Sequence, residues 1–274
     1  MVEPASLVLT LSEGIPLSCT LPGARAIVVN CVGCPGCDLA ECPWGASVDP
    51  RISKRVELHD LIKVLKRGYS IELVFFRCIN DTPSETLLSM LNEARSMKRF
   101  FVGFSVHVAY IDRVLDLLKN VDIVQVVVTP RYIEALNDIY SRLRNYVLSV
   151  MEIAIVVEPK TLEYIHRFLG SMKNNTIDVP ATVIPTEDID PRRYSSLIDA
   201  VRKLIPLTSD PLSPMTDIAS VICPRCRGYV ILRVSGSILK LNVDEHGRCK
   251  YCGNKVVTLV TKCVHRYFID IPLA

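Results

Sequence analysis

The chain has 274 residues, of which 49% are hydrophobic, and a formal net charge of +3. This composition excludes a disordered chain, and the small charge excludes global electrostatic steering toward nucleic acid or a membrane. No stretch has the length and polarity of a membrane span, and the N-terminus lacks the pattern of a signal peptide. We therefore expect cytoplasmic residence, where thiols stay reduced and eleven cysteines indicate metal binding rather than disulfides.

Strand-like and helix-like segments alternate along residues 26–205. Between the strands, apolar residues recur at helical spacing and predict six helices, over residues 58–65, 87–94, 111–118, 133–143, 162–169 and 197–205. A Pro stands where four of these helices should begin. Near-continuous apolar, β-branched runs predict strands buried on both faces, at Ala26–Val29, Ile71–Phe76, Phe100–Val106, Val121–Val128, Met151–Val157 and Val179–Ile184. The pattern predicts an α/β fold with a parallel (β/α)6 sheet, either a partial barrel or an open doubly wound sheet.

We predict three parts along the chain. Residues 1–205 form the α/β domain, which begins with a small hairpin of Leu7–Leu11 and Leu17–Leu21. Residues 206–220 are rich in Pro, Ser and Asp and are predicted to be a linker. Residues 221–274 form a small zinc-ribbon-like module.

The first cysteine group follows the first predicted strand directly and consists of Cys31, Cys34, Cys37 and Cys42. Its spacing, C-x2-C-x2-C-x4-C-P, is one residue longer at the last step than the run used by bacterial ferredoxins. We predict a 4Fe–4S cluster wrapped by this loop, and a zinc knuckle made from two of these pairs is the alternative. In parallel α/β folds ligands bind at the carboxyl ends of strands, which is where the loop begins.

The cysteine loop, followed by repeated βα units, resembles the radical S-adenosylmethionine (SAM) enzymes. It is most similar to archaeal proteins related to the pyruvate formate-lyase activating enzyme, some of which also end in a tail with paired CxxC motifs. In the family pattern C-x3-C-x2-C, Cys34 and Cys37 match the last two positions, Asn30 stands at the first, and Cys31 would substitute for it. The stretch Phe76–Asp81 stands where the family has Gly-Gly-Glu-Pro.

The resemblance implies a radical-SAM-like partial barrel with a 4Fe–4S cluster held by Cys31, Cys34 and Cys37. SAM would bind the open iron and yield a 5′-deoxyadenosyl radical that acts on a protein or a small molecule, with an electron donor as a further partner. If Cys42 is instead a fourth ligand, no iron stays open. The chain is then a SAM-independent iron–sulfur protein that serves electron transfer or structure, so Cys42 divides the two hypotheses.

The second cysteine group consists of two C-x2-C pairs separated by 22 residues. This spacing predicts a tetrahedral site of four thiolates that is structural, because no coordination position stays open. We expect zinc, with a rubredoxin-like iron as the alternative. Between the pairs, Val230–Val234 and Ile238–Val243 predict a hairpin that turns at Ser235-Gly236. The four predicted ligands are Cys223, Cys226, Cys249 and Cys252.

Residues 221–274 are basic, with nine Lys or Arg against three acidic residues. We expect a solvated tail with neither a nucleic-acid nor a membrane partner, and a nucleic-acid contact on this surface is the open alternative.

Three residues stand near the ends of predicted strands, where a cofactor pocket would form. We expect His107, Glu158 and Cys78 to have structural roles there, as a satisfied histidine, a helix N-cap and a buried small hydrophobe.

Overall fold

The computed structural model describes most of the chain outside the first cysteine loop. The described residues are 4–31, 70–77, 79, 82, 84–96, 100–144, 150–172, 176–257, 259–261, 264 and 270–272. Several sequence predictions lie outside them, namely those for Cys34, Cys37, Cys42, Cys78 and the helix predicted over residues 58–65.

One large sheet of nine strands forms the body of the protein, in the order β12-β1-β2-β3-β4-β5-β6-β7-β8. All neighbours from β2 to β8 are parallel, whereas β1 lies antiparallel between β2 and β12. The predicted α/β class is confirmed, with a mostly parallel sheet. The strands are β1 (Pro4–Leu11), β2 (Arg25–Cys31), β3 (Leu73–Arg77), β4 (Phe101–His107), β5 (Ile123–Val128), β6 (Val150–Val157), β7 (Ala181–Pro185), β8 (Thr208–Ser209) and β12 (Asp270–Pro272).

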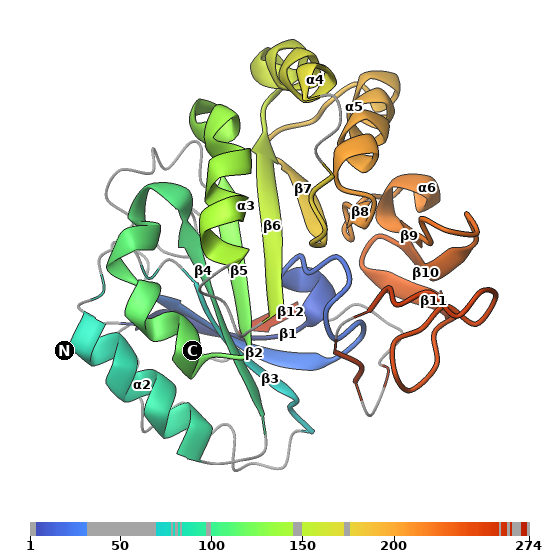
Figure 1. The fold of residues 1–274 in the computed structure, drawn as a ribbon. Coiled ribbons are helices and arrows are strands. Elements are labelled where there is room, and N and C mark those ends of the chain that lie inside the picture. The colour runs from blue at the N-terminus through green and yellow to red at the C-terminus, as the bar shows by residue number, and fades with distance from the viewer. Residues whose placement is uncertain are drawn as a thin grey trace.

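The main helices pack on one face of this sheet (Figure 1). Strand order from β2 to β8 follows the sequence without reversal, and right-handed crossovers in such a sheet place their connections on the same face. We call the opposite face of the sheet the inner face. The helices are α2 (Ser84–Ser96), α3 (Leu136–Arg144), α4 (Leu162–Ser171) and α5 (Pro191–Leu204), and 3-10 turns η6 (Pro130–Ala135) and η7 (Pro159–Thr161) precede α3 and α4.

All six predicted strands are confirmed as β2 to β7, but one predicted helix is not an α-helix. The chain between β4 and β5 forms two 3-10 turns, η4 (Val108–Arg113) and η5 (Leu115–Asn120). A 3-10 helix has three residues per turn, so it buries every third side chain on one face. Val108, Ile111, Val114 and Leu117 are buried at this spacing of three, and Leu118 is buried beside them. Ile111, Val114 and Leu118 also fit a period of about 3.6, so the apolar pattern alone predicted an α-helix.

The predicted N-terminal hairpin is wrong in its second arm. Leu17–Leu21 is not a strand, and β1 pairs instead with β2. Residues 12–24, which we call the β1–β2 loop, begin with the 3-10 turn η1 (Ser12–Gly14) and are almost entirely buried. The loop packs against the inner face, where Ile15, Leu17 and Leu21 join an apolar cluster with residues of β2, β3 and β5. A buried loop needs hydrogen-bond partners for its backbone.

Polar side chains of the inner face supply those partners. Arg77 of β3 donates a hydrogen bond to the carbonyl of Gly14. The amide nitrogen of Gln125, in β5, donates to the carbonyls of Ile15 (3.3 Å) and Pro16 (3.0 Å). Side chains of the strands therefore provide hydrogen bonds to the backbone of this loop, as neighbouring strands provide them to one another.

Glu152 of β6 holds the next part of the loop. Its carboxylate accepts hydrogen bonds from the backbone N–H groups of Ser18 (2.7 Å), Cys19 (3.0 Å) and Thr20 (2.8 Å), and from the Thr20 hydroxyl (2.5 Å). The side chain is fully buried, and burial raises the pKa of Glu152 while these hydrogen bonds oppose the rise. Four donors around one carboxylate fix the course of the loop.

A second, three-stranded antiparallel sheet in the order β11-β10-β9 lies on the other side of this loop (Figure 1). The predicted hairpin is confirmed, and positive φ angles at Ser235 (45°) and Gly236 (76°) make its turn. Cys19 of the loop packs into the apolar cluster beneath these strands. The strands are β9 (Val221–Ile222), β10 (Tyr229–Val234) and β11 (Ser237–Leu241).

A buried ion pair ties this small sheet to the loop. Arg233 of β10 donates to Glu13 Oε1 through Nε (3.1 Å) and Nη2 (3.0 Å), and both side chains are fully buried. The same guanidinium donates from Nη1 to the carbonyl of Ser18 (2.8 Å). The loop is thus held by the large sheet on one side and by β10 on the other.

The predicted boundaries at 1–205, 206–220 and 221–274 stay predictions. The expected linker holds β8, which joins the large sheet, and the short helix α6 (Thr216–Ala219). Strand β12 also belongs to the large sheet, through its pairing with β1. Within the described residues, no helix combines the length and apolar character that crossing a membrane requires.

Replacing Glu13 with Leu leaves the buried Arg233 guanidinium without its counter-charge. We expect the free energy of unfolding to fall by about 3–5 kcal/mol, measured from urea denaturation midpoints. Adding Arg233→Met to this variant should restore part of the loss, because the stranded charge is removed. The exposed pair of Arg193 and Glu163 (3.2 Å) provides the control, and Glu163→Gln should barely move the midpoint. An unchanged midpoint in Glu13→Leu would contradict this account.

Candidate metal centre

The first C-x2-C pair forms a tight knuckle between β9 and β10. The N–H of Cys223 donates to the carbonyl of Gly228 (2.9 Å), and the N–H of Arg227 donates back to the carbonyl of Cys223 (2.9 Å). Arg227 takes a positive φ of 60°, in the left-handed region that favours glycine. These bonds turn the chain so that the thiols of Cys223 and Cys226 lie on one side.

The second pair repeats this geometry. The N–H of Cys249 donates to the carbonyl of Asn254 (2.8 Å), and the N–H of Gly253 donates to the carbonyl of Cys249 (2.8 Å). Gly253 stands at the position equivalent to Arg227 and has a φ of 74°. Two knuckles with the same hydrogen bonds at the same spacing make a pseudo-symmetric pair that presents its thiols to a common point.

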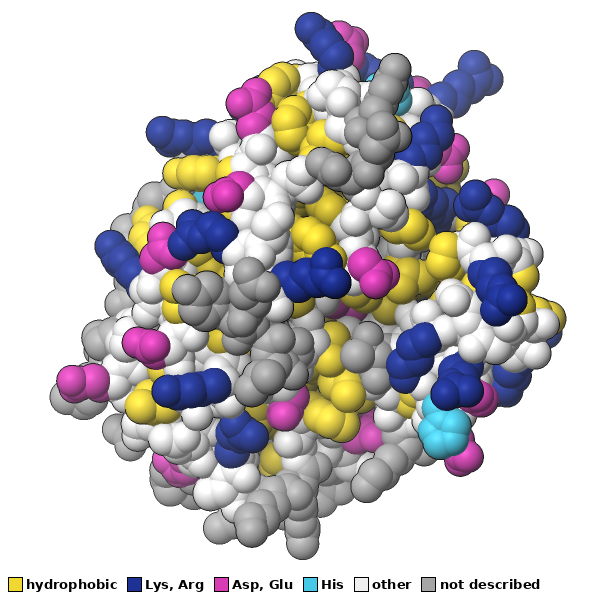
Figure 2. Space-filling view, viewed as in Figure 1, with side chains coloured by type: hydrophobic (Ala, Val, Ile, Leu, Met, Phe, Trp, Pro, Cys, Tyr) yellow, Lys and Arg dark blue, Asp and Glu magenta, His cyan; other side chains and the backbone are white. Residues whose placement is uncertain are grey.

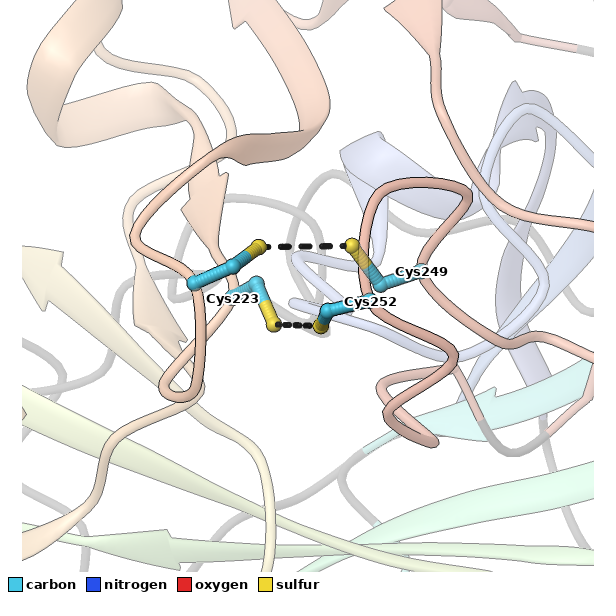
Figure 3. Close-up of side chains that lie close together, drawn as sticks. Cys223, Cys249 and Cys252 are labelled. Carbon is cyan, nitrogen blue, oxygen red and sulfur yellow. Dashed lines mark hydrogen bonds between the residues drawn. The ribbon is translucent and has the colours of Figure 1, made fainter.

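The structure brings all four predicted ligands of the second group together (Figure 3). Their sulfur atoms lie within 4.8 Å of one another, with Cys223 Sγ 3.6 Å from Cys252 Sγ and Cys226 Sγ 3.7 Å from Cys249 Sγ. Sulfurs bound at about 2.3 Å to one tetrahedral ion lie about 3.8 Å apart. All four cysteines are free thiols, so the group can hold a metal ion.

The ionisation of these thiols is coupled. Burial acts to raise the pKa of Cys223, but the N–H groups of Cys226 and Arg225 and the sulfur of Cys252 outweigh it and lower the pKa to about 7. At Cys226 the N–H of Gly228 lowers the pKa, yet the three neighbouring sulfurs raise it to about 12. One thiolate forms readily and then opposes the next, so a bound cation is needed to hold four thiolates together.

A tetrahedral ion held by these four cysteines would have no open position for a substrate. Cys223 and Cys249 are buried among apolar side chains that include Val230 and Val243, whereas Cys226 is exposed. Such a site stabilises a small sheet that has little apolar surface of its own to bury.

Of the first cysteine group, Cys31 is the one residue that the structure describes. It is the last residue of β2 and lies with Ile27 and Val29 in the apolar cluster on the helix side of the sheet. Burial raises the pKa of Cys31 to about 12, while a hydrogen bond with Thr82 opposes the rise. Its neighbour Asn30 belongs to the alternate set of side chains, which faces the inner side. Cys31 is therefore positioned as a buried small hydrophobe.

Polar residues stand at the carboxyl ends of β4 and β6, at the same edge of the sheet as the end of β2. His107 Nδ1 accepts a hydrogen bond from the N–H of Ala109 (3.2 Å), and its Nε2 lies 3.3 Å from the Thr129 hydroxyl. Its ring also contacts Tyr132 edge-on, with 5.3 Å between centroids. Glu158 is the N-cap of η7. Both ring nitrogens of His107 therefore have partners, and Glu158 stands at a helix N-cap, as the sequence predicts.

Sequence reasoning missed the residues that hold the β1–β2 loop. Gln125 and Glu152 each interrupt an apolar strand, and such an interruption was the available signal. Their partners are backbone groups more than a hundred residues away, which no local pattern identifies.

No protein-family model, curated protein or solved structure matches the chain.

Replacing Cys249 with Ala removes one of the four metal ligands. We expect this variant to lose the metal from the C-terminal centre and to melt at a lower temperature, because the metal contributes to folding. The measurement is metal content by mass spectrometry together with thermal unfolding. Cys19→Ala is the matched control, since Cys19 lies in the same apolar cluster without being a ligand. Full metal content in Cys249→Ala would refute the assigned ligand set.

The two knuckles offer a paired test of backbone strain. Arg227→Gly should raise the free energy of unfolding by about 0.5–1 kcal/mol, because glycine adopts this φ without a steric cost. Gly253→Ala should lower it by about 1 kcal/mol, and the added methyl meets no atom within 4 Å, so φ alone causes the loss. Urea denaturation of the metal-loaded protein measures both. Effects of equal sign would contradict the equivalence of the knuckles.

Proposed function

We propose that the protein is a radical-SAM-type iron–sulfur protein, with a 4Fe–4S cluster in its first cysteine loop and a structural zinc at the C-terminal centre. One observation carries the proposal. The cysteine-rich segment follows β2, the first of seven parallel strands, directly at its carboxyl end. Ligands of parallel α/β folds bind at that edge.

The proposed form of the sheet is the predicted (β/α)6 partial barrel. Support comes from the strand order, because a doubly wound sheet reverses its order at a switch point and β2 to β8 do not. Helices on one face and a buried loop on the inner face suit a curved sheet with an inside and an outside. The proposed C-terminal part is the zinc-ribbon-like module, supported by its three short strands and two knuckles.

The position of Cys31 bears on the cluster ligands. A thiol in the apolar cluster beside Thr82 does not fit the donor set of a cluster in the loop that follows. We therefore assign the cluster to Cys34, Cys37 and Cys42, a change from the predicted set. Cys34 and Cys37 keep their places in the family pattern, and Cys42 stands outside it. Three thiolates leave one iron open, which a SAM-dependent enzyme needs. The alternative with a closed cluster needs all four cysteines as ligands, and the burial of the Cys31 thiol in the apolar cluster disfavours it.

A cluster with an open iron would supply the electron that cleaves SAM. The chain's own contribution at this edge is positional. His107 is the last residue of β4, Thr129 follows β5, and the contact between their side chains fixes both. Arg77 is the last residue of β3 and faces the inner side of the sheet. Thiolate ligand sets need a reducing compartment, which supports the expected cytoplasmic residence. A protein or small-molecule substrate and an electron donor are the partners proposed.

For the C-terminal centre we propose zinc over iron. Structural sites of four thiolates in paired knuckles are typical of zinc, and the sulfur distances suit an ion of that size. The metal content of protein purified under anaerobic conditions distinguishes the two. A rubredoxin-like iron would also still colour the protein after the cysteines of the first loop are replaced.

Anaerobic reconstitution of cysteine variants tests the cluster. Cys34→Ala, Cys37→Ala and Cys42→Ala should each lose iron and sulfide, whereas Cys31→Ala should retain both, since its thiol is a core group. Added SAM should perturb the electron paramagnetic resonance signal of the reduced cluster. Preparations with zinc alone in this loop would overturn the proposal. Loss of the cluster in Cys31→Ala, together with a signal indifferent to SAM, would favour the closed cluster instead.

A further inference from the structure

An exposed aromatic ring stands beside the C-terminal metal centre. Tyr251 lies within the second knuckle and is 60% exposed, the largest exposed fraction among the large hydrophobic side chains described. Its ring lies against Gly228 of the first knuckle, close enough that a Cβ there would be 3.0 Å from a ring carbon. The ring is thus supported on one side by the first knuckle and open to solvent on the other.

Three exposed cations stand on the same two knuckles as this ring. Arg225 and Arg227 of the first knuckle and Lys250 of the second are all exposed. The Arg225 guanidinium reaches across the centre, with Nη1 3.5 Å from the carbonyl of Cys252, and so stays near the ring. Lys and Arg side chains also gather over this part of the molecule in Figure 2.

The charge of the module favours an anionic partner. Residues 221–257 hold six exposed Lys or Arg against two acids, Asp244 and Glu245, and Asp244 is engaged by backbone N–H groups of its own loop. The buried Arg233 is neutralised by Glu13 and does not contribute. Four thiolates on one divalent ion add about −2, so the surface stays positive by about two charges.

We propose that this surface binds single-stranded nucleic acid, with Tyr251 stacking on a base and Arg225, Arg227 and Lys250 contacting phosphates. The exposed ring decides between anionic partners. An acidic protein would need the cations alone, whereas a supported, open ring between cations is the arrangement that binds bases and backbone together. This site is independent of the cluster and of SAM.

Three phosphate contacts and one stacked base determine the expected salt dependence and affinity. Three phosphate contacts predict a slope of log K against log salt of about −2 for a single strand. Stacking on an aromatic ring contributes about 1–3 kcal/mol per base, so Tyr251→Ala should weaken binding about 5- to 150-fold. Tyr251→Phe should retain binding, because stacking uses the ring and not the hydroxyl.

The experiment uses the full metal-loaded chain and a fluorescein-labelled twelve-nucleotide oligouridylate, with binding followed by anisotropy between 50 and 200 mM salt. Lys250→Ala should reduce the slope by about 0.7, the value of one phosphate. The matched control is Lys203→Ala on α5, which removes the same charge elsewhere and should leave the slope unchanged. Zinc content and melting temperature confirm that each variant keeps its fold.

Two results would overturn the proposal. One is binding that is equal in the parent chain and Tyr251→Ala, which would mean that no base stacks on the ring. The other is displacement of the oligouridylate by polyglutamate at equal charge concentration, which would assign the surface to an acidic protein partner. Double-stranded probes should bind more weakly than oligouridylate at the same salt, because their bases are already stacked.

Discussion

The structure depends on a buried loop whose backbone finds many of its hydrogen-bond partners in side chains of the large sheet. Thirteen residues between β1 and β2 lie between the large sheet and the C-terminal strands. Backbone groups removed from water must be paired. Turns at Ser12 and Leu21 pair some of the loop's groups with one another, and side chains of the large sheet pair others. Glu152 supplies four acceptor contacts, and Gln125 and Arg77 supply donors, so three strands each contribute one side chain.

The same loop connects the metal centre to the sheet. Arg233 belongs to the strand that follows the first knuckle, and its buried guanidinium reaches Glu13 and Ser18 in the loop. Because a buried charge without its partner costs several kcal/mol, the two parts are held in one arrangement. The metal at the four cysteines would therefore stabilise more than its own knuckles. The proposed cluster would be held by the segment that follows β2, a different part of the chain.

Local patterns in the sequence predicted what local physics determines. The apolar runs predicted β2 to β7, and the CxxC spacing predicted four ligands that the structure brings within 4.8 Å. The predictions that were wrong depended on non-local contacts or on small differences in the spacing of apolar residues. Leu17–Leu21 has the composition of a strand, but Glu152, 132 residues from Thr20, takes its hydrogen bonds. The placement of Cys31 depends on which side of β2 its side chain faces, and spacing carries no information on that. Likewise, the exposure of Tyr251 appears only when the knuckles are assembled.

Hydrogen exchange at the backbone amides of Ser18, Cys19 and Thr20 tests the central claim most directly. These amides belong to a loop by sequence, yet they donate to a fully buried carboxylate. The account predicts that they exchange as slowly as the amides of β6, through global unfolding alone. It also predicts faster exchange once a chelator removes the metal. Rapid exchange of these three amides in the metal-loaded protein, at the rate of an exposed loop, would contradict it.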